Sequence, residues 1–368
     1  MRVAIVGQDC DPRSNTLWFE VLRRLPESRL LLPVSPRNES EARFELESAA
    51  PDLRSRIELV HAWMPRGETS LVWSGVRHRL QQMGPDLIHV VAEPWALVAQ
   101  QVSRWSNCFI IHSAENILVT APLPYRIRRI GMRKVLRAAS GAVSWGQTGL
   151  AAMREAGLPD ATPAVLCASR PPNPQNFPHS PLPDEVTPLR VAYGGRLVKV
   201  KGVQTLIDAI DALSPSSVNV RVLGDGPFRG SLEALAHDKN VAIEFMGTGS
   251  ERDVADLFRW AHVVVVPTLV SRRYSEQWGR IAVEAIMCGR AVIASDSGEL
   301  PFIVGDPEMV FPHGDSSLLA SVIQRLADDR KLLEVKTTSS SERAPLFAPS
   351  AQADDLIGLW RDVSENPR

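Results

Sequence analysis

Two glutamates eight positions apart, Glu276 and Glu284, are the residues of this chain whose type and spacing best suit chemistry. Glu284 stands in a run rich in Ala, Ile and Met that predicts a buried helix ending at Gly289. If the helix begins near Gly279, Glu276 lies on the loop before it and Glu284 on its second turn. A helix N-terminus offers unpaired N–H groups and partial positive charge, which suit a phosphate, and carboxylates accept hydrogen bonds from vicinal hydroxyls. The pattern therefore predicts a nucleotide-sugar site.

Two basic residues, Arg196 and Lys201, flank a predicted strand-to-helix loop upstream of these carboxylates. A guanidinium fork and an ammonium point charge at this place can both reach a diphosphate. In a transfer reaction without a metal, such cations stabilise the departing nucleoside diphosphate, where negative charge grows most. The alternative interpretation is a lysine at a helix start and a solvated arginine.

Three motifs in this half of the chain resemble those of the retaining glycosyltransferases of family 4 (glycosyl transferases group 1). Glu276 to Glu284 resembles the E-x7-E signature, Tyr193–Gly202 looks like the G-R-L-x-x-x-K-G loop, and Ser295–Pro301 looks like the S-D-S-G-E-x-P turn. The resemblance covers roughly residues 188 to 330. It implies the GT-B fold: two Rossmann-like, doubly wound α/β domains that face each other across a cleft, with a C-terminal helix crossing back to the N-terminal domain.

The hydrophobic pattern itself predicts two α/β domains, because short apolar strands alternate with helical stretches in two series. The predicted strands of the first series are Val3–Val6, Leu30–Leu32, Ile57–Val60, Leu87–Val91, Phe109–Ile111 and Ala142–Val143, and the second series begins with Leu189–Tyr193. Between them, residues 171–188 carry seven prolines, which predict a linker because proline at this density forms neither helix nor central strand. The predicted domains are residues 1–170 on the acceptor side, joined by a helix at about 349–368, and residues 189–345 for the nucleotide sugar. A polar, serine-rich stretch at 337–342 precedes the last helix.

The resemblance also implies roles for single residues. Glu284 holds the ribose, Glu276 faces the sugar ring, and Arg196 and Lys201 contact the diphosphate. Further contacts to the nucleotide sugar come from glycine turns and from the turn before the helix: Gly195, Gly224, Gly226, Gln277, Trp278, Gly279 and Arg280. Trp278 stands where the family usually has Phe, a departure that crowds the predicted pocket. The alternatives are a buried helix acid capped by a neighbouring side chain for Glu284 and a plain tight turn at Gly224–Pro227.

In the first half, His112 follows an apolar strand and is predicted at its carboxyl end, facing the cleft. Members of the family often place a histidine there, close to the reacting sugar, so His112 joins the predicted catalytic residues; the alternative is a satisfied structural histidine. Glu115 and Asn116 on the same loop, and Glu93 after the preceding strand, are candidates for contact with the acceptor. We expect no metal ligands and no cofactor, because no D-x-D pair follows a strand.

Composition narrows the class of protein. Lys and Arg total 41 against 42 for Asp and Glu, so the chain has no excess of positive charge that would favour binding to nucleic acid. Four scattered cysteines predict a reduced, cytoplasmic setting, and Met1 leads directly into a strand-like run, which does not suggest a secretory signal. The basic stretch 125–137 is either a solvated helix face or a site of peripheral contact with an anionic inner membrane face.

Together these features predict a retaining, metal-independent glycosyltransferase that moves a hexosyl unit from a UDP- or GDP-sugar to an acceptor. The acceptor is a saccharide, a lipid-linked saccharide or a small molecule, as in glycan, glycolipid or natural-product biosynthesis. The alternatives are a non-catalytic nucleotide-sugar-binding module and a GT-B epimerase.

Overall fold

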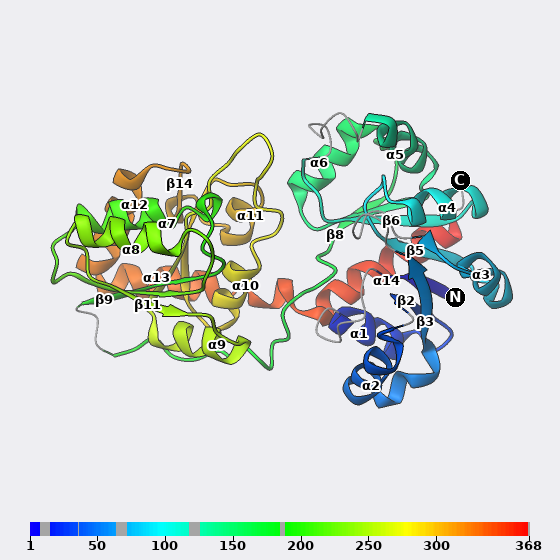
Figure 1. The fold of residues 1–368 in the computed structure, drawn as a ribbon, viewed down its shortest axis with the longest axis horizontal. Helices are drawn as coiled ribbons and strands as arrows, with labels where there is room; N and C mark the ends of the chain where they lie inside the picture. Colours follow the sequence, from blue (N-terminus) through cyan, green and yellow to red (C-terminus); the bar gives the residue numbers. More distant parts are fainter. Residues whose placement is uncertain (8–14, 36, 64–71, 118–125, 185–187, 367–368) are drawn as a thin grey trace. The chain divides into compact units, whose positions relative to one another are not determined.

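The computed structural model describes residues 1–7, 15–35, 37–63, 72–117, 126–184 and 188–366. The chain forms two compact units (Figure 1). Unit 1 comprises Met1–Pro171 together with Pro349–Arg368, and unit 2 comprises Pro172–Ala348. Each unit is a layered α/β structure built on one sheet.

Unit 1 contains an eight-stranded sheet in the order β4-β3-β2-β1-β5-β6-β7-β8, parallel except between β3 and β4. Its strands are β1 (Val3–Val6), β2 (Arg29–Val34), β3 (Ile57–Trp63), β4 (Val72–Trp73), β5 (Leu87–Val91), β6 (Phe109–Ser113), β7 (Gly141–Ser144) and β8 (Ala164–Leu166). Every residue of β1, β5, β6 and β7 is buried, because helices cover both faces of the sheet. The sequence pattern predicted all of these strands except β4 and β8, two short edge strands.

The helices of unit 1 pack two cores, one on each face of the sheet. They are α1 (Thr16–Arg24), α2 (Glu39–Ala49), α3 (Val76–Met83), α4 (Leu97–Trp105), α5 (Arg126–Ala138), α6 (Gln147–Ala156) and α14 (Pro349–Glu365), with the 3₁₀ turn η2 (Pro51–Arg56). Helix α14 packs against α1 and β8, and its Leu356 and Trp360 are fully buried in the same core as α1 (Figure 1). The last helix of the chain thus belongs to unit 1.

Unit 2 contains a parallel six-stranded sheet in the order β11-β10-β9-β12-β13-β14. Its strands are β9 (Leu189–Gly194), β10 (Val218–Leu223), β11 (Ile243–Gly247), β12 (Val263–Val266), β13 (Ala291–Ser295) and β14 (Val310–Phe311). The order of the strands reverses between β9 and β12. In open α/β sheets, ligands bind at the carboxyl ends of the strands beside such a reversal.

Seven α-helices lie among the described residues of unit 2, and most of them connect successive strands. They are α7 (Val203–Asp211), α8 (Arg229–Asp238), α9 (Glu251–Trp260), α10 (Arg280–Met287), α11 (Leu300–Val304), α12 (Ser316–Asp328) and α13 (Arg330–Ser341), with the 3₁₀ turns η5 (Lys199–Lys201), η6 (Pro307–Met309) and η7 (Ala344–Phe347). The serine-rich stretch is the end of α13 rather than an irregular segment. Two of its hydroxyls donate to carbonyl oxygens of the helix itself, Thr338 Oγ1 to Glu334 O at 2.9 Å and Ser341 Oγ to Thr337 O at 2.8 Å.

The proline-rich segment has neither helix nor strand in its described residues, as predicted, but it lies with unit 2. The fully buried guanidinium of Arg290 holds it there. Its Nη1 donates to Ser180 O at 2.9 Å and its Nη2 to Pro181 O at 3.0 Å, while its Nε donates to Phe258 O at 2.6 Å. One side chain thus joins the segment to the end of α9.

Candidate active site

The candidate site begins with two glycine loops, at the carboxyl ends of β9 and β10. Gly224 has a φ of 149°, and a Cβ there would lie 1.8 Å from Gly195 O, so only glycine fits. A Cβ at Gly226 would lie 2.3 Å from Leu197 O, and Leu197 N donates to Asp225 O at 2.9 Å. These contacts bring the predicted residues Gly195, Gly224 and Gly226 together, backbone against backbone.

An ion pair joins two predicted catalytic residues in unit 2. Lys201, at the end of η5, places its Nζ 2.6 Å from Glu276 Oε2, which lies on the loop between β12 and α10. The same oxygen accepts hydrogen bonds from Thr268 Oγ1 at 3.0 Å and from Tyr274 OH at 3.4 Å. Burial opposes the charge of Lys201, but the Glu276 carboxylate outweighs it and raises the pKa of the lysine. Lys201 is therefore charged at neutral pH.

The Ser295–Pro301 motif holds the backbone of Glu276 in place. Glu276 N donates to Ser297 Oγ at 3.2 Å, and Glu299 N donates to Glu276 O at 3.0 Å. Gly298, with a φ of 56°, lies so close that a Cβ would be 2.0 Å from Glu276 O. The turn after β13 thus supports the loop that carries Glu276.

Glu284 lies on the second turn of α10, as predicted, with its side chain 7% exposed. Its Oε1 accepts from Arg280 Nε at 2.7 Å, and the same arginine reaches Glu251 Oε1 through Nη2 at 2.8 Å. Burial raises the pKa of Glu284 to about 7, because it outweighs the attraction of Arg280. The neighbouring arginine thus supplies the partner that the alternative interpretation required, and the carboxylate changes its charge near neutral pH.

The remaining predicted residues of this unit surround α10 and η5. Arg196 is exposed, and its guanidinium has no ion-pair partner within the described part of the chain. Gly279 forms the N-cap of α10 with a φ of 74°, and Gln277 lies partly exposed beside it. Trp278 is buried and packs edge to face against Phe347, with ring centroids 6.3 Å apart. Its indole therefore contributes to the packing of α10 against η7.

The predicted catalytic His112 lies inside β6, 1% exposed, in a chain of hydrogen bonds within unit 1. Trp360 Nε1 lies 3.0 Å from His89 Nδ1, His89 Nε2 lies 3.0 Å from His112 Nδ1, and His112 Nε2 lies 2.9 Å from Cys167 O. Indole N–H only donates, so each neutral imidazole must accept at Nδ1 and donate from Nε2. Both nitrogens of His112 are thus engaged, and this geometry corrects its predicted exposure to a cleft in favour of the structural interpretation.

The acceptor-side candidates lie at the carboxyl ends of β5 and β6. Glu93 is buried; its Oε2 accepts from Ser113 Oγ at 2.5 Å and its Oε1 from Ala114 N at 3.0 Å. Burial raises the pKa of Glu93 to about 7, and the charge of Glu115 adds to this effect. Asn116 follows on the same loop, half-buried. The structure thus places the three candidates after the carboxyl ends of two neighbouring parallel strands.

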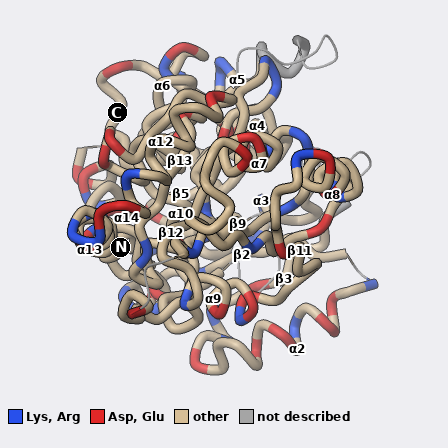
Figure 2. The backbone as a smooth tube through the Cα atoms, turned by 90° about the vertical axis from the view of Figure 1, so that its left-hand side faces the viewer, with Lys and Arg blue, Asp and Glu red and all other residues tan. Residues whose placement is uncertain are grey.

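Helix α5 covers most of the predicted basic stretch 125–137; residue 125 and the side chains of 126–130 lie outside the described part. Met132, Val135 and Leu136 are buried, whereas Arg133 and Lys134 are exposed. No helix among the described residues combines the length and the apolar character that a bilayer span requires. Figure 2 shows that α2 is mainly acidic; its sequence carries Glu39, Glu41, Glu45 and Glu47 against Arg43 alone.

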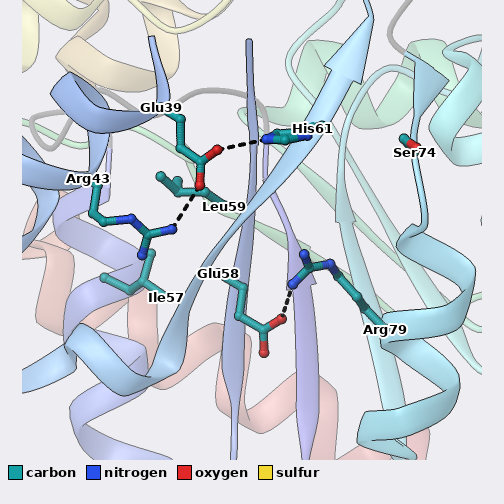
Figure 3. Close-up of a pocket in the computed structure, with 8 residues that line it drawn as sticks. All are labelled: Glu39, Arg43, Ile57, Glu58, Leu59, His61, Ser74 and Arg79. Atoms are coloured by element: carbon teal, nitrogen blue, oxygen red, sulfur yellow. Dashed lines mark hydrogen bonds and ion pairs between the residues drawn. The ribbon is translucent and has the colours of Figure 1, made fainter. Parts of the chain in front are cut away.

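A hollow of about 390 Å³ lies at the outer edge of β3 (Figure 3). In it Glu39 binds His61 at 2.7 Å and Arg43 at 3.0 Å, and Glu58 binds Arg79 at 3.0 Å. Strand β3 pairs with β4 only at Ala62 and Trp63. Charged side chains along an open edge discourage pairing with another chain, which accounts for this cluster.

Sequence reasoning missed Thr268 and Tyr274, the hydroxyl groups that bond to Glu276. Thr268 follows Pro267 after a predicted strand. Its place at the carboxyl end of that strand could have marked it as a candidate site residue. Tyr274 lies in a loop, Thr268–Ser275, whose only regular feature is the bridge between Ser271 and Tyr274.

No group of three or more His, Cys, Asp or Glu within the described residues is placed to hold a metal ion.

Known structures share this fold over the whole chain. A sucrose-phosphate synthase from Thermosynechococcus elongatus superposes with a TM-score of 0.73 at 22% identity, covering 99% of both chains. Anabaena HepE in complex with UDP superposes with a TM-score of 0.74 at 17% identity, covering 98% of this chain and 100% of that one. These likenesses confirm the predicted GT-B fold of two Rossmann-like domains.

The sequence of unit 2 matches a known family model. Residues 188–329 match the family described as Glycosyl transferases group 1, so the resemblance predicted from three motifs is confirmed for this segment. A D-inositol 3-phosphate glycosyltransferase of Corynebacterium kroppenstedtii is 28% identical over 187 residues, 47% of this chain and 40% of that protein. The chain thus spans less than half the length of the first curated relatives that it matches. A 2-deoxystreptamine glucosyltransferase of Streptomyces kanamyceticus is 25% identical over 311 residues, 76% of this chain and 77% of that protein.

Proposed function

We propose that this protein is a retaining glycosyltransferase that moves a hexosyl unit from a nucleoside-diphosphate sugar, with UDP or GDP as the carrier, to an acceptor. The observation that carries the proposal is the ion pair between Lys201 and Glu276 on the loop before α10, the helix that carries the buried Glu284 on its second turn. The family match of this segment supports it, and HepE, a protein of the same fold, has been solved with UDP.

Each group of the site has a part in this reaction. Lys201 and Arg196 stabilise the negative charge that grows on the departing nucleoside diphosphate. The amides at the start of α10 favour a phosphate, Glu284 accepts hydrogen bonds from the ribose, and Glu276 accepts them from the sugar. The acceptor attacks from the face that the phosphate leaves, and the phosphate takes up its proton, so no metal ion is required. His112 has no part in this scheme, because both of its ring nitrogens are bonded within unit 1.

The acceptor binds unit 1 through Glu93, Glu115 and Asn116, which lie at the carboxyl ends of parallel strands. We propose a saccharide, a lipid-linked saccharide or a small molecule, glycosylated in the cytoplasm. A lipid-linked acceptor would be reached through contact of the basic residues of α5 with an anionic membrane face. Sedimentation with vesicles of phosphatidylserine at low and high salt tests that contact: binding must be lost at high salt.

The test of function is incubation with UDP-, GDP- and ADP-sugars, with thermal shift for binding and release of free nucleotide for turnover. We expect a shift and slow hydrolysis with one of them, unchanged by EDTA, and no shift for Glu284→Ala. Proton NMR of the released sugar reports the anomer, which must be that of the nucleotide sugar. Binding without turnover would favour a non-catalytic module, and conversion of one nucleotide sugar into its epimer would favour a GT-B epimerase.

A further inference from the structure

The lysine and the glutamate expected to serve two different parts of the sugar donor are bonded to each other in this structure. The side chain of Lys201 is 26% exposed and that of Glu276 is 12% exposed, so each charge is largely removed from water. Leaving a largely buried charge without its partner is costly, because removing one member of such a pair leaves the other uncompensated. Lys201 therefore reaches a diphosphate only if another group satisfies Glu276.

Two hydroxyl groups already donate hydrogen bonds to Glu276 in this structure. Thr268 Oγ1 and Tyr274 OH bond to Oε2 of Glu276, the same oxygen that Lys201 holds. The ring of Tyr274 also lies 5.4 Å from Lys201 Nζ, within the range of a cation–π contact. These two side chains lie on the chain that leads from β12 to Glu276, so they remain beside the carboxylate when the long lysine side chain moves.

We propose that Lys201 and Glu276 form a partner-exchange switch that distinguishes a nucleoside-diphosphate sugar from the free nucleoside diphosphate, and that Thr268 and Tyr274 are its positioning residues. The proposal rests on the proposed function. When the nucleotide sugar binds, Lys201 moves to the diphosphate and hydroxyls of the sugar donate to Glu276 in its place. A free nucleoside diphosphate takes Lys201 but brings no hydroxyl to Glu276, so it binds at the cost of the ion pair.

The exchange has a consequence for turnover. Once the sugar has left for the acceptor, Glu276 loses the hydroxyls that replaced the lysine. Lys201 then returns to Glu276, and the nucleoside diphosphate loses one of its cationic contacts. The same pair of residues therefore favours binding of the substrate and release of the product.

The test is isothermal titration calorimetry of the full chain with UDP and UDP-glucose, and in parallel with GDP and GDP-mannose. Wild-type protein should bind the nucleotide sugar more tightly than the free nucleotide. In Glu276→Gln, Lys201 has no carboxylate to leave, so the free nucleotide should bind about 10-fold more tightly, a change of ~1.4 kcal/mol. The preference for the nucleotide sugar should shrink by at least that factor. The matched control Glu244→Gln removes an exposed ion pair with Arg221 in the same unit and should leave both affinities unchanged.

Tyr274→Phe and Thr268→Val test the positioning residues. Each removes a hydroxyl that supports Glu276 after the lysine leaves, so the free nucleotide should bind roughly 3- to 10-fold more weakly. In the double variant Tyr274→Phe with Glu276→Gln this loss should disappear, because the hydroxyl then has no carboxylate to support. A merely structural role for the tyrosine would give the same loss in both backgrounds.

The outcomes separate the two proposals. If wild-type protein binds a nucleotide sugar but Glu276→Gln binds the free nucleotide no more tightly, the exchange is wrong and the proposed function stands. Additive losses in the double variant exclude the positioning role of Tyr274. If none of the UDP-, GDP- or ADP-sugars binds wild-type protein, the proposed function itself is overturned, and the exchange with it.

Discussion

The hydrogen-bonded chain from Trp360 through His89 and His112 to Cys167 predicts that unit 1 loses stability in acid. Each imidazole must stay neutral, since protonation would place a second N–H against the N–H that Trp360 or His89 already directs at its Nδ1. Burial lowers the pKa of His112 to about 4 and that of His89 well below its usual value, where the neighbouring imidazole adds to the effect. Replacing His112 by Asn removes one of the two groups.

The magnitude follows from counting protons. In the unfolded chain a histidine takes up its proton near pH ~6.5, whereas in the folded chain His112 does so only near pH 4. Both histidines are neutral in both states above pH ~6.5, so their contribution is fully present there and is lost as the pH falls. Each proton bound only by the unfolded state changes the free energy of unfolding by ~1.4 kcal/mol per pH unit, and two such protons by ~2.7 kcal/mol.

Urea unfolding of the full chain between pH 7.5 and 4.5 measures this slope. We expect His112→Asn to be less stable than wild type at pH 7.5 by about 1–3 kcal/mol, because it leaves buried polar groups without their bonds. Its slope below pH ~6 should be shallower by ~1.4 kcal/mol per unit. His237→Asn, at a side chain that is 90% exposed, is the matched control and should keep the wild-type slope. Equal slopes for wild type and His112→Asn, or an NMR titration of His112 near pH ~6.5, would refute the reasoning.

Three further changes have defined outcomes. Arg290→Met should lower the free energy of unfolding by about 3–5 kcal/mol, because several buried carbonyls lose their donor, whereas exposed Arg252→Met should have little effect; equal urea midpoints would contradict this. Gly298→Ala should lose about 1–3 kcal/mol and abolish the thermal shift with nucleotide sugars, since its φ of 56° and a carbonyl 2.0 Å from the new Cβ force the loop to move. Gly230→Ala, with open space at its Cβ, is its control and should be neutral or stabilising in the same melts. Because burial raises the pKa of Glu284 to about 7, affinity for a nucleotide sugar should rise between pH 6 and 8 as the carboxylate ionises, and Glu284→Gln should bind weakly without that dependence; the same pH profile in both proteins would exclude Glu284 as the titrating group.

Much of the fold was predictable because local pattern and tertiary burial agree. The four valines of β12 are fully buried between helices, and a continuous apolar run in the sequence indicates such a strand. Strands β4 and β8 were missed because an edge strand of two or three residues is too short to show a pattern of apolar and polar side chains. The end of α13 was missed because serine and threonine in sequence favour turns, whereas Thr338 and Ser341 bond to the backbone of the helix here.

The site was predictable to the extent that spacing along the chain determines proximity. Glu276 and Glu284 lie where a helix with Gly279 as its N-cap requires, one before α10 and one on its second turn. The ion pair between Lys201 and Glu276 joins residues 75 positions apart, and only the packing of two loops reveals it. His112 shows the opposite case, because its place after an apolar run suggested exposure, while Trp360, more than two hundred positions later, reaches its partner His89 and completes the bonded chain.

Helix α14 returns to unit 1 after the chain has built all of unit 2, and it fills the core beside α1 with Leu356, Trp360 and Val363. During synthesis on the ribosome, unit 2 therefore emerges before α14, the helix that completes unit 1. Until then unit 1 exposes the apolar surface that α14 will cover, a surface that invites association with other nascent chains. The order of synthesis thus leaves the first-made domain to be finished last.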